Sequence, residues 1–542
     1  MSLPIDRRSL IVTGSLGLAG LALPGFAQTP NVTRLTGFTH AVASGEPGPD
    51  TMLFWTRYVP NGPDHATLRL EVSETPDFAR VIAGGSTTTG AWRDFTAKVT
   101  VSGLSPGTRY HYRFVAPDGA RSPVGRTRTL PDDAARRFTA AVFSCSNLPF
   151  GYFNAYAHAA ARDDIDLAIH LGDYYYEYRR GNYPAEGDAV DARWPEPGNE
   201  IVTLADYRLR LASYRADPDL QALHAAKPMI VQWDDHESAN DAWEGGAQNH
   251  QAGEGDWSAR KAAAMQAYRE WMPIDDTPWK AYDIGRLATL FRTETRLLAR
   301  TRELDLEPAL RAADPLAALK AFRDGPWMDP AATMLGSAQE IWLARALATS
   351  VRAGRRWQVV GFGTILGEQR TPEAALGWLD ASSSPRARGY VTNGVTAARA
   401  GLPANMDSWG GYPAARRRFL QSVEAAGAEL IVISGDSHNG WAFDLKQDGR
   451  AMGVEFAGHA VTSPGYESGV RTDPATVAAA LIAASPELKW CDTSRRGYMA
   501  LTLTPDSARN DWLFVDTIQT RTPRASVGHS ATVARGRRAM VV

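Results

Sequence analysis

The chain has 542 residues, of which 44% are apolar and 22% are charged, and its formal net charge at pH 7 is −2. This is the composition of a folded globular protein, and the length suffices for a large catalytic core with an accessory domain. The small net charge argues against a nucleic acid or an anionic membrane as the main partner. We therefore expect a small-molecule partner and no stable membrane anchor.

The first thirty residues differ from the rest of the chain. Arg7 and Arg8 precede an apolar run from Ile11 to Leu23, which ends shortly before Ala27. The run is too short, and too rich in Gly and Ser, for a membrane span of about 20 apolar residues, and it is typical of a signal peptide. An ordinary Sec signal that happens to carry two arginines is the alternative. The weak hydrophobicity behind the pair favours a signal of the twin-arginine type. We predict that residues 1–27 are such a signal, that the twin-arginine translocation machinery exports the folded chain, and that it works in the periplasm or is secreted.

Residues 28–134 consist of short strand-like segments separated by turns. Four of them alternate in polarity or are rich in β-branched and aromatic side chains: Thr51 to Thr56, Thr67 to Val72, Thr96 to Val101 and Tyr110 to Phe114. The segment from Leu104 to Tyr110 resembles the turn that leads into a tyrosine corner of fibronectin-III-like sandwiches. We predict a fibronectin-III-like β-sandwich with a structural or positional role.

Residues 135–542 change to apolar runs that alternate with amphipathic, alanine-rich segments. The predicted strands are Thr139 to Phe143, Ile165 to Leu171, Met229 to Trp233, Gln358 to Phe362 and Leu430 to Ser434, and a helix is predicted from Tyr152 to Arg162. The stretch from Trp257 to Ser350 is expected to be mostly helical. This alternation predicts an α/β or layered α+β core, which we take as one catalytic domain.

Four of the five apolar runs are followed at once by side chains that bind metal ions. They are Cys145 after the first run, Asp173 and Tyr176 after the second, Asp234, Asp235 and His236 after the third, and Asp436 and His438 after the last. Because the carboxyl ends of strands in such sheets meet in one crevice, segments far apart in sequence can converge there.

Carboxylates a few Å apart in a semi-buried site raise each other's pKa, and bound cations remove this conflict. Carboxylates suit hard ions such as Ca²⁺, Mg²⁺ or Fe³⁺, whereas His438 and a Cys145 thiolate favour a transition metal. The mixture predicts a mixed-metal site, which can activate a bridging hydroxide and clamp a phosphoryl group.

Other interpretations of these residues exist. Cys145 and Cys491 are the two cysteines and could form a disulfide, although a position at the end of an apolar run suits a ligand better. Asp234, Asp235 and Glu237 could act as the paired carboxylates of a glycosidase, but the histidine between them argues against this. A lipase would need a nucleophilic serine elbow, and we do not predict one in this chain.

The four motifs, in this order, resemble those of the dimetal metallophosphoesterase superfamily and, more closely, the PhoD family of alkaline phosphatases and phosphodiesterases. The resemblance extends over nearly the whole chain and includes further segments: His40 to Gly45, Leu53 to Arg57, Arg269 to Pro273, Met334 to Gln339 and Trp409 to Pro413. It implies an α+β protein in which the sandwich precedes a layered α/β/β/α metallophosphoesterase catalytic domain.

The resemblance also implies a centre of one Fe³⁺ with one or more Ca²⁺. Cys145, Asp173, Tyr176 and His438 would bind the iron. Asp173 would bridge to calcium, which Asp235 and Asp436 would complete, with Asp234 as a further ligand. His236 would act as general acid or contact the phosphate, and the nucleophile would be a metal-bound hydroxide. Asn240 and Arg296 are candidate substrate-binding residues. Glu46 and Glu294 stand where the family has Asp, and we expect them to support the site rather than to bind metal.

We therefore predict an exported, metal-dependent phosphoesterase that hydrolyses phosphate monoesters and/or diesters, best at alkaline pH, for phosphate scavenging. One alternative is a phospholipase D-like phosphodiesterase of the same family. Another is a secreted hydrolase of a different class, such as a glycosidase. A non-enzymatic extracellular binding protein is supported only by the sandwich.

Overall fold

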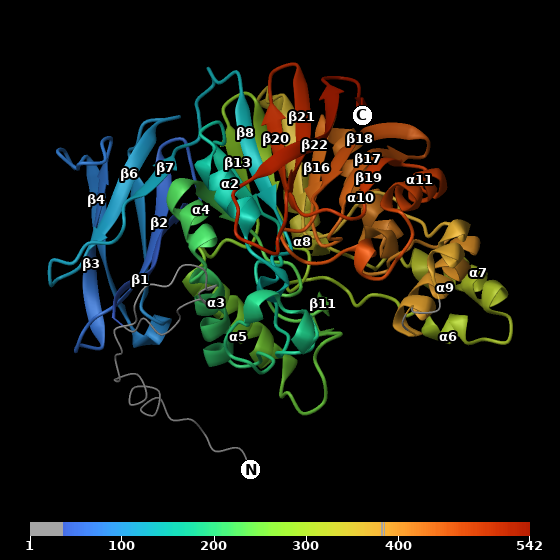
Figure 1. Cartoon of the computed structure of the whole chain (residues 1–542). Coiled ribbons are helices and arrows are strands. Elements are labelled where there is room, and N and C mark those ends of the chain that lie inside the picture. The colour runs from blue at the N-terminus through green and yellow to red at the C-terminus, as the bar shows by residue number, and fades with distance from the viewer. Residues whose placement is uncertain (1–35, 381–382, 384, 542) are drawn as a thin grey trace, which may run out of the picture.

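The computed structural model describes residues 36–380, 383 and 385–541 (Figure 1). The predicted signal peptide and its arginine pair lie outside these residues. Within the described part of the chain, no helix combines the length and the apolar character needed to cross a membrane.

The N-terminal part is a β-sandwich, as predicted. A sheet in the order β4 (Ala83–Gly90), β3 (His65–Ser73), β6 (Arg109–Val115), β7 (Gly125–Arg128) faces the strands β1 (Gly37–Gly45), β2 (Thr51–Val59) and β5 (Thr96–Ser102). Phe54, Leu70 and Tyr112 are buried between the two layers. The Tyr110 hydroxyl accepts a hydrogen bond from the backbone N–H of Ser105 at 2.8 Å, which is the bond expected of a tyrosine corner.

One layer of the sandwich belongs to a larger sheet. Strand β1 pairs in parallel with β10 (Pro228–Val231), so the sheet runs β23-β22-β21-β20-β8-β9-β10-β1-β2-β5. Its other members are β8 (Phe138–Phe143), β9 (Leu167–His170), β20 (Gly497–Leu503), β21 (Ser507–Val515), β22 (Ala525–Ala534) and β23 (Met540–Val541). The sheet therefore crosses the expected boundary between residues 134 and 135.

A second sheet of seven strands packs against the first. Its order is β13 (Lys280–Ile284), β14 (Ala288–Arg292), β15 (Trp357–Phe362), β16 (Leu430–Ser434), β18 (Arg450–Ala457), β17 (Gly440–Gln447), β19 (Leu488–Asp492). Val142, Ile230 and Ile431 are buried in the apolar layer between the sheets. A small hairpin, β11 (Ala242–Trp243) with β12 (Gly246–Ala247), stands apart from both sheets.

Helices cover the outer faces of both sheets. The ten-stranded sheet packs against α2 (Asn154–Ala161), α3 (Leu204–Arg215), α4 (Pro218–Ala226) and α5 (Trp257–Trp271). The seven-stranded sheet packs against α8 (Gly336–Arg352), α9 (Pro385–Arg399), α10 (Pro413–Ala426) and α11 (Pro474–Ala484), while α6 (Glu307–Leu310) and α7 (Pro315–Asp324) join α9 in a satellite cluster. In Figure 1, α3 to α5 lie on one side of the strands and α10 and α11 on the other. The four-layered α/β/β/α arrangement confirms the predicted fold class.

The prediction of a mostly helical stretch from Trp257 to Ser350 is wrong for its middle. Strands β13 and β14 form an antiparallel hairpin there, from Lys280 to Arg292, at one edge of the second sheet. Each strand has five residues, and periodicity alone cannot distinguish so short an apolar run from a buried helical turn. Burial of residues such as Leu290 between the sheets decides the outcome.

Candidate metal centre

The predicted ligands follow the carboxyl ends of four strands and converge on one small volume. Three sets of potential ligand atoms each lie within 4.8 Å of one another: Cys145, Asp173 and His438; Asp173, Asp235 and His236; and Asp234, Asp235 and Asp436. The first two sets share Asp173, and the last two share Asp235. The structure therefore brings residues from β8, β9, β10 and β16 together, as the strand-end pattern predicts.

The backbone at these strand ends adopts an unusual conformation. Cys145, Asp173, Asp436 and His438 have φ angles of 59°, 55°, 64° and 62°, in the left-handed region that residues other than glycine rarely enter. Such residues cluster at functional sites, where the surrounding structure compensates for the strain. Gly172 has a φ of 118°, and its backbone lies very close to Asp234. A Cβ at position 172 would be only 2.4 Å from the Asp234 Cβ. These sharp turns direct the side chains that follow the strands into one volume.

Tyr176 joins the first set through a chain of hydrogen bonds. The Tyr176 hydroxyl donates to Asp173 Oδ2 at 3.1 Å, accepts from Ser463 Oγ at 2.7 Å and lies 3.4 Å from His438 Nε2. His438 Nδ1 donates to the Pro464 carbonyl at 2.7 Å. Burial lowers the pKa of His438 to about 4, so the ring is neutral and its Nε2 lone pair faces the cluster. Thiol, phenol, imidazole and carboxylate thus meet at one point.

The charge balance of the cluster fits bound cations. Burial raises the pKa of Asp173 and of Asp436 well above the usual range, and nearby carboxylates raise each further. Burial, followed by the charge of Asp173, does the same for the Cys145 thiol. Among the described residues, the buried Oδ1 atoms of Asp173 and Asp235 have no hydrogen-bond partner. A buried oxygen without a donor is suited to a metal ion, and the donor set fits a transition metal on one side and a hard cation on the other.

His236 is held in place by a carboxylate that the sequence analysis did not single out. Its Nδ1 lies 2.7 Å from Glu177 Oε2, and its ring centroid is 4.1 Å from that of Tyr176. Glu177 also accepts from the Asn240 backbone N–H and from the Asn249 amide. With Nδ1 bound to Glu177, the other ring nitrogen is left to face the cluster. Glu177 lies four residues after Asp173, and only its place directly after Tyr176 could have drawn attention to it.

Glu237 ties two of the ligand-bearing turns together. Its carboxylate accepts from the backbone N–H groups of Asp173 at 3.0 Å, Tyr174 at 2.7 Å and Asp234 at 2.8 Å. The side chain is buried, with 2% exposure. The glycosidase interpretation needs a carboxylate that can reach a substrate, whereas that of Glu237 is engaged by the backbone on both oxygens. The sequence pointed to Glu237 only as a possible glycosidase carboxylate, and its position directly after His236 is the signal for this positioning role.

Arg296 does not extend into an open pocket. It is fully buried, and its guanidinium donates to Asp234 at 2.7 and 3.1 Å and to both oxygens of Asp407 at 2.8 and 2.7 Å. Nη2 also lies 3.9 Å from Asp235 Oδ1. Asn240 bonds to Tyr178 and Gln248 through its side chain. The substrate-binding roles of Arg296 and Asn240 therefore stay predictions.

Glu46 and Glu294 are engaged by protein groups. Glu46 forms ion pairs with Lys280 and Arg292. Glu294 accepts from Trp233 Nε1 at 2.8 Å and from the backbone N–H groups of residues 296–298. Both carboxylates hold loops beside the centre.

Two alternatives from the sequence do not fit the structure. Cys145 and Cys491 are both buried free thiols, so they form no disulfide. The segment Gly103-Leu104-Ser105-Pro106-Gly107 matches the spacing of a serine elbow, but it lies in the turn between strands β5 and β6. An elbow leads from a strand into a helix, so Ser105 is not such a nucleophile.

Comparison with known proteins agrees with this geometry. A family model described as PhoD-like phosphatase matches residues 140–512, and that of the PhoD-like phosphatase N-terminal domain matches residues 25–131. The chain is 31% identical over 547 residues to alkaline phosphatase D of Bacillus subtilis (strain 168), covering 94% of this chain and 84% of that protein. A solved structure described as "Structure of PhoD" is similar with a TM-score of 0.75 and 28% identity, over 96% of this chain and 93% of that chain.

The four layers and the clusters of potential metal ligands at the strand ends are consistent with a phosphoesterase. The chain belongs to the PhoD-like phosphatase family, whose members are phosphoric ester hydrolases. The family resemblance drawn from the motifs is thereby confirmed.

The contacts of Glu237 predict that it is needed for metal binding. In Glu237→Gln, an amide NH₂ would face backbone donors, and the turns carrying Asp173 and Asp234 would separate. Loss of a hydrogen bond that orients metal-binding residues typically lowers metal affinity about 10- to 100-fold. Metal content after dialysis, measured by elemental analysis, should fall below that of the wild type.

Glu487→Gln is the matched control, because Glu487 is also buried and accepts backbone N–H bonds, from Glu368 and Lys446. Its metal content should equal that of the wild type. Full metal retention in Glu237→Gln would contradict the positioning role.

Proposed function

We propose that the chain is an exported phosphoesterase that hydrolyses small phosphate monoesters and/or diesters at a centre of one ferric iron with one or more calcium ions. The observation that carries the proposal is the set of three overlapping ligand groups joined by Asp173 and Asp235. Phosphate scavenging is the proposed purpose, and the periplasm or the exterior the proposed location.

The donor atoms suggest how the two kinds of metal are divided. Cys145, Tyr176 and His438 offer sulfur, phenolate oxygen and nitrogen, which suit ferric iron, and Asp173 completes this set. Asp235 and Asp436 offer only carboxylate oxygens, which suit calcium. Asp173 lies in both neighbourhoods and is the proposed bridge. Asp234 is in the third set, but its carboxylate is already paired with Arg296, so we assign it to the edge of the calcium side.

The chain's own residues supply orientation and a proton. When bound, the metal ions would lower the pKa of a water molecule and clamp the phosphoryl oxygens. His236, held by Glu177, points its free nitrogen toward Asp173 and Asp235, and we propose that it protonates the leaving oxygen. Arg296 donates to both Asp234 and Asp407 and so fixes the positions of their side chains. Asn240, at the partly exposed rim, remains the candidate contact to substrate oxygens.

The iron assignment predicts a coloured protein. Phenolate or thiolate bound to ferric iron should give a visible charge-transfer band, and a chelator that removes the metals should abolish phosphate release. Tyr176→Phe should lose or shift the band, whereas Tyr174→Phe should keep it, because the Tyr174 hydroxyl bonds to His224 outside the cluster. Absorption spectra with elemental analysis test this. A colourless, iron-free and fully active protein would refute the iron and leave the hydrolase intact.

The role of His236 predicts a dependence on the leaving group. His236→Asn should lower kcat for an alkyl phosphate by roughly 10²- to 10⁴-fold, the usual contribution of a general acid. The loss should be much smaller for 4-nitrophenyl phosphate, because nitrophenolate leaves without protonation. His158→Asn is the control, since His158, on α2, bonds to Tyr498 of β20 away from the cluster. An equal loss for both esters would show that His236 binds phosphate instead.

Export by the twin-arginine route predicts a specific failure. A double variant, Arg7→Lys with Arg8→Lys, should accumulate in the cytoplasm at full length, because the receptor reads the arginine pair. The wild type should be found outside the inner membrane, shortened near Ala27. Arg34→Lys, beyond the signal, should behave as the wild type. Cell fractionation and mass spectrometry test this, and export of the double variant would favour the Sec route.

A further inference from the structure

One predicted strand end, that of β15, supplies no side chain to the three ligand sets. The turn after this strand, residues 363–367, nevertheless lies against the candidate centre. The Thr364 hydroxyl donates to Asp436 Oδ2 at 3.0 Å. A Cβ on Gly363 would lie only 2.1 Å from Asp234 Oδ1. The turn therefore contacts two of the three carboxylates in the third ligand set.

One buried carboxylate joins this turn to the strand that leads to Asp436. Glu455, on β18, is fully buried. Its Oε1 accepts from the Leu366 backbone N–H at 2.9 Å and from Ser434 Oγ at 2.6 Å, and its Oε2 accepts from the Gly367 backbone N–H at 2.6 Å. Ser434 is the last residue of β16, two residues before Asp436. Glu455 thus fixes the turn after β15 relative to the end of β16.

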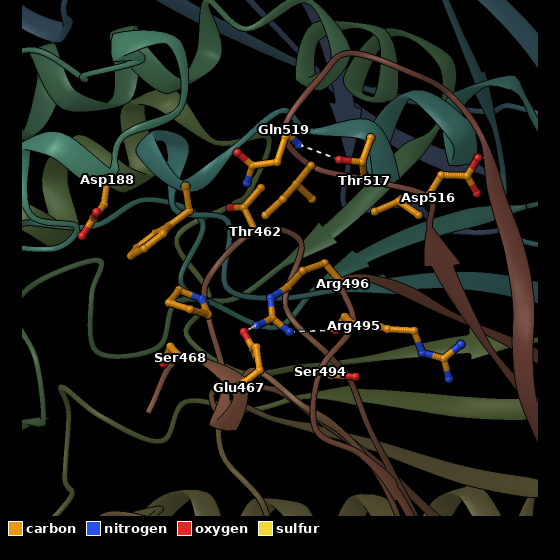
Figure 2. Close-up of a pocket in the computed structure, with 14 residues that line it drawn as sticks. Asp188, Thr462, Glu467, Ser468, Ser494, Arg495, Arg496, Asp516, Thr517 and Gln519 are labelled. Carbon is orange, nitrogen blue, oxygen red and sulfur yellow. Dashed lines mark hydrogen bonds and ion pairs between the residues drawn. The ribbon is translucent and has the colours of Figure 1, made fainter. Parts of the chain in front are cut away.

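The His438 side of the turn after β16 is held by a different segment. His438 Nδ1 donates to the Pro464 carbonyl at 2.7 Å, and Arg496 Nη1 donates to the His438 carbonyl at 3.5 Å. Figure 2 shows Arg496 in the middle of the residues that line a cavity of about 520 Å³ on that side. Because separate groups fix the two ends of this turn, a change on the Asp436 side can leave His438 in place.

We propose that Glu455 is a positioning residue for the calcium side of the centre, because it holds the turn that carries Thr364 in the place where it orients Asp436. This inference rests on the proposed function, since it needs a cation bound by Asp436. In Glu455→Gln, the amide NH₂ would face the backbone N–H of Leu366 or of Gly367, whichever way the side chain is turned. One of these two backbone bonds would be lost, and the carboxylate of Asp436 would lose its fixed orientation.

Calcium binding to the purified enzyme tests this role. Burial raises the pKa of Glu455 to about 7, so the measurement is made at a pH near 8.5, where its carboxylate is ionised in the wild type. After calcium has been removed, isothermal titration calorimetry should give a dissociation constant for Ca²⁺ that is about 10- to 100-fold higher in Glu455→Gln. The iron content and the visible band should stay those of the wild type.

The outcomes separate this inference from the proposed function. An unchanged dissociation constant for Ca²⁺ in Glu455→Gln, even with a lower melting temperature, would show a purely structural role and overturn the inference alone. An equal loss of iron and calcium would also overturn it. If the wild type bound no calcium, the calcium side of the proposed function would be overturned together with the inference.

Two further variants guard against a general loss of stability. Thr364→Val removes the hydroxyl that donates to Asp436 but keeps the backbone bonds of the turn, so it should weaken calcium binding without lowering the melting temperature. If Glu455→Gln does not fold, wild-type calcium affinity in Thr364→Val would overturn the inference. Glu71→Gln is the control, because Glu71 is a buried carboxylate of the sandwich that pairs with Arg113. Its calcium affinity should equal that of the wild type.

Discussion

The architecture around the candidate site depends on one electrostatic constraint, the burial of several carboxylates and a thiol in a single small volume. Asp173, Asp234 and Asp235 are nearly withdrawn from water, and desolvation of an anion without a partner is costly. In the described structure, the permanently charged side chain of Arg296 reaches this volume. Its Nε donates to Asp234, but its Nη1 is bound to Asp407 instead. Without further positive charge Asp173 and Asp436 would be protonated, because burial raises the pKa of both well above the usual range. The cluster is therefore built for cations, and the fold provides the rigidity that keeps its members together.

That rigidity comes from polar groups that bind no metal. Glu237 binds the turn after β9 to the turn after β10, Glu177 orients His236, and Pro464 fixes the ring of His438. These contacts hold turns whose backbone is in the left-handed region, a conformation that costs about 1–3 kcal/mol per residue. The apolar layer between the sheets and the helices outside them supply the stability that offsets this strain. The candidate site is thus formed by strained turns at the strand ends, and the well-packed sheets and helices support them.

Sequence was informative where ligand chemistry and strand pattern coincide. Asp173 and Asp436 follow apolar runs, so their convergence could be predicted, and the order of the motifs indicated the family. Contacts that depend on side-chain direction could not be predicted. Nothing in the sequence around Asp407 marks it as the partner of Arg296, because it lies in an irregular loop 111 residues away. Likewise, the strands β13 and β14 were missed, since their five-residue length carries no clear periodicity.

The sandwich is more than an attachment to this scaffold. Strand β10, which leads directly to Asp234 and Asp235, is held between β9 on one side and β1 of the sandwich on the other. Glu46, just after β1, pairs with Arg292 at the end of β14, and so connects the sandwich to the second sheet. Trp55 of β2 donates to the Glu270 carbonyl of α5 at 2.9 Å. Without β1, the backbone edge of β10 would be unpaired beside the candidate metal ligands. The N-terminal strands therefore contribute to the site by fixing the position of the strand that delivers two of its carboxylates, although none of the clustered ligand side chains lies in the sandwich.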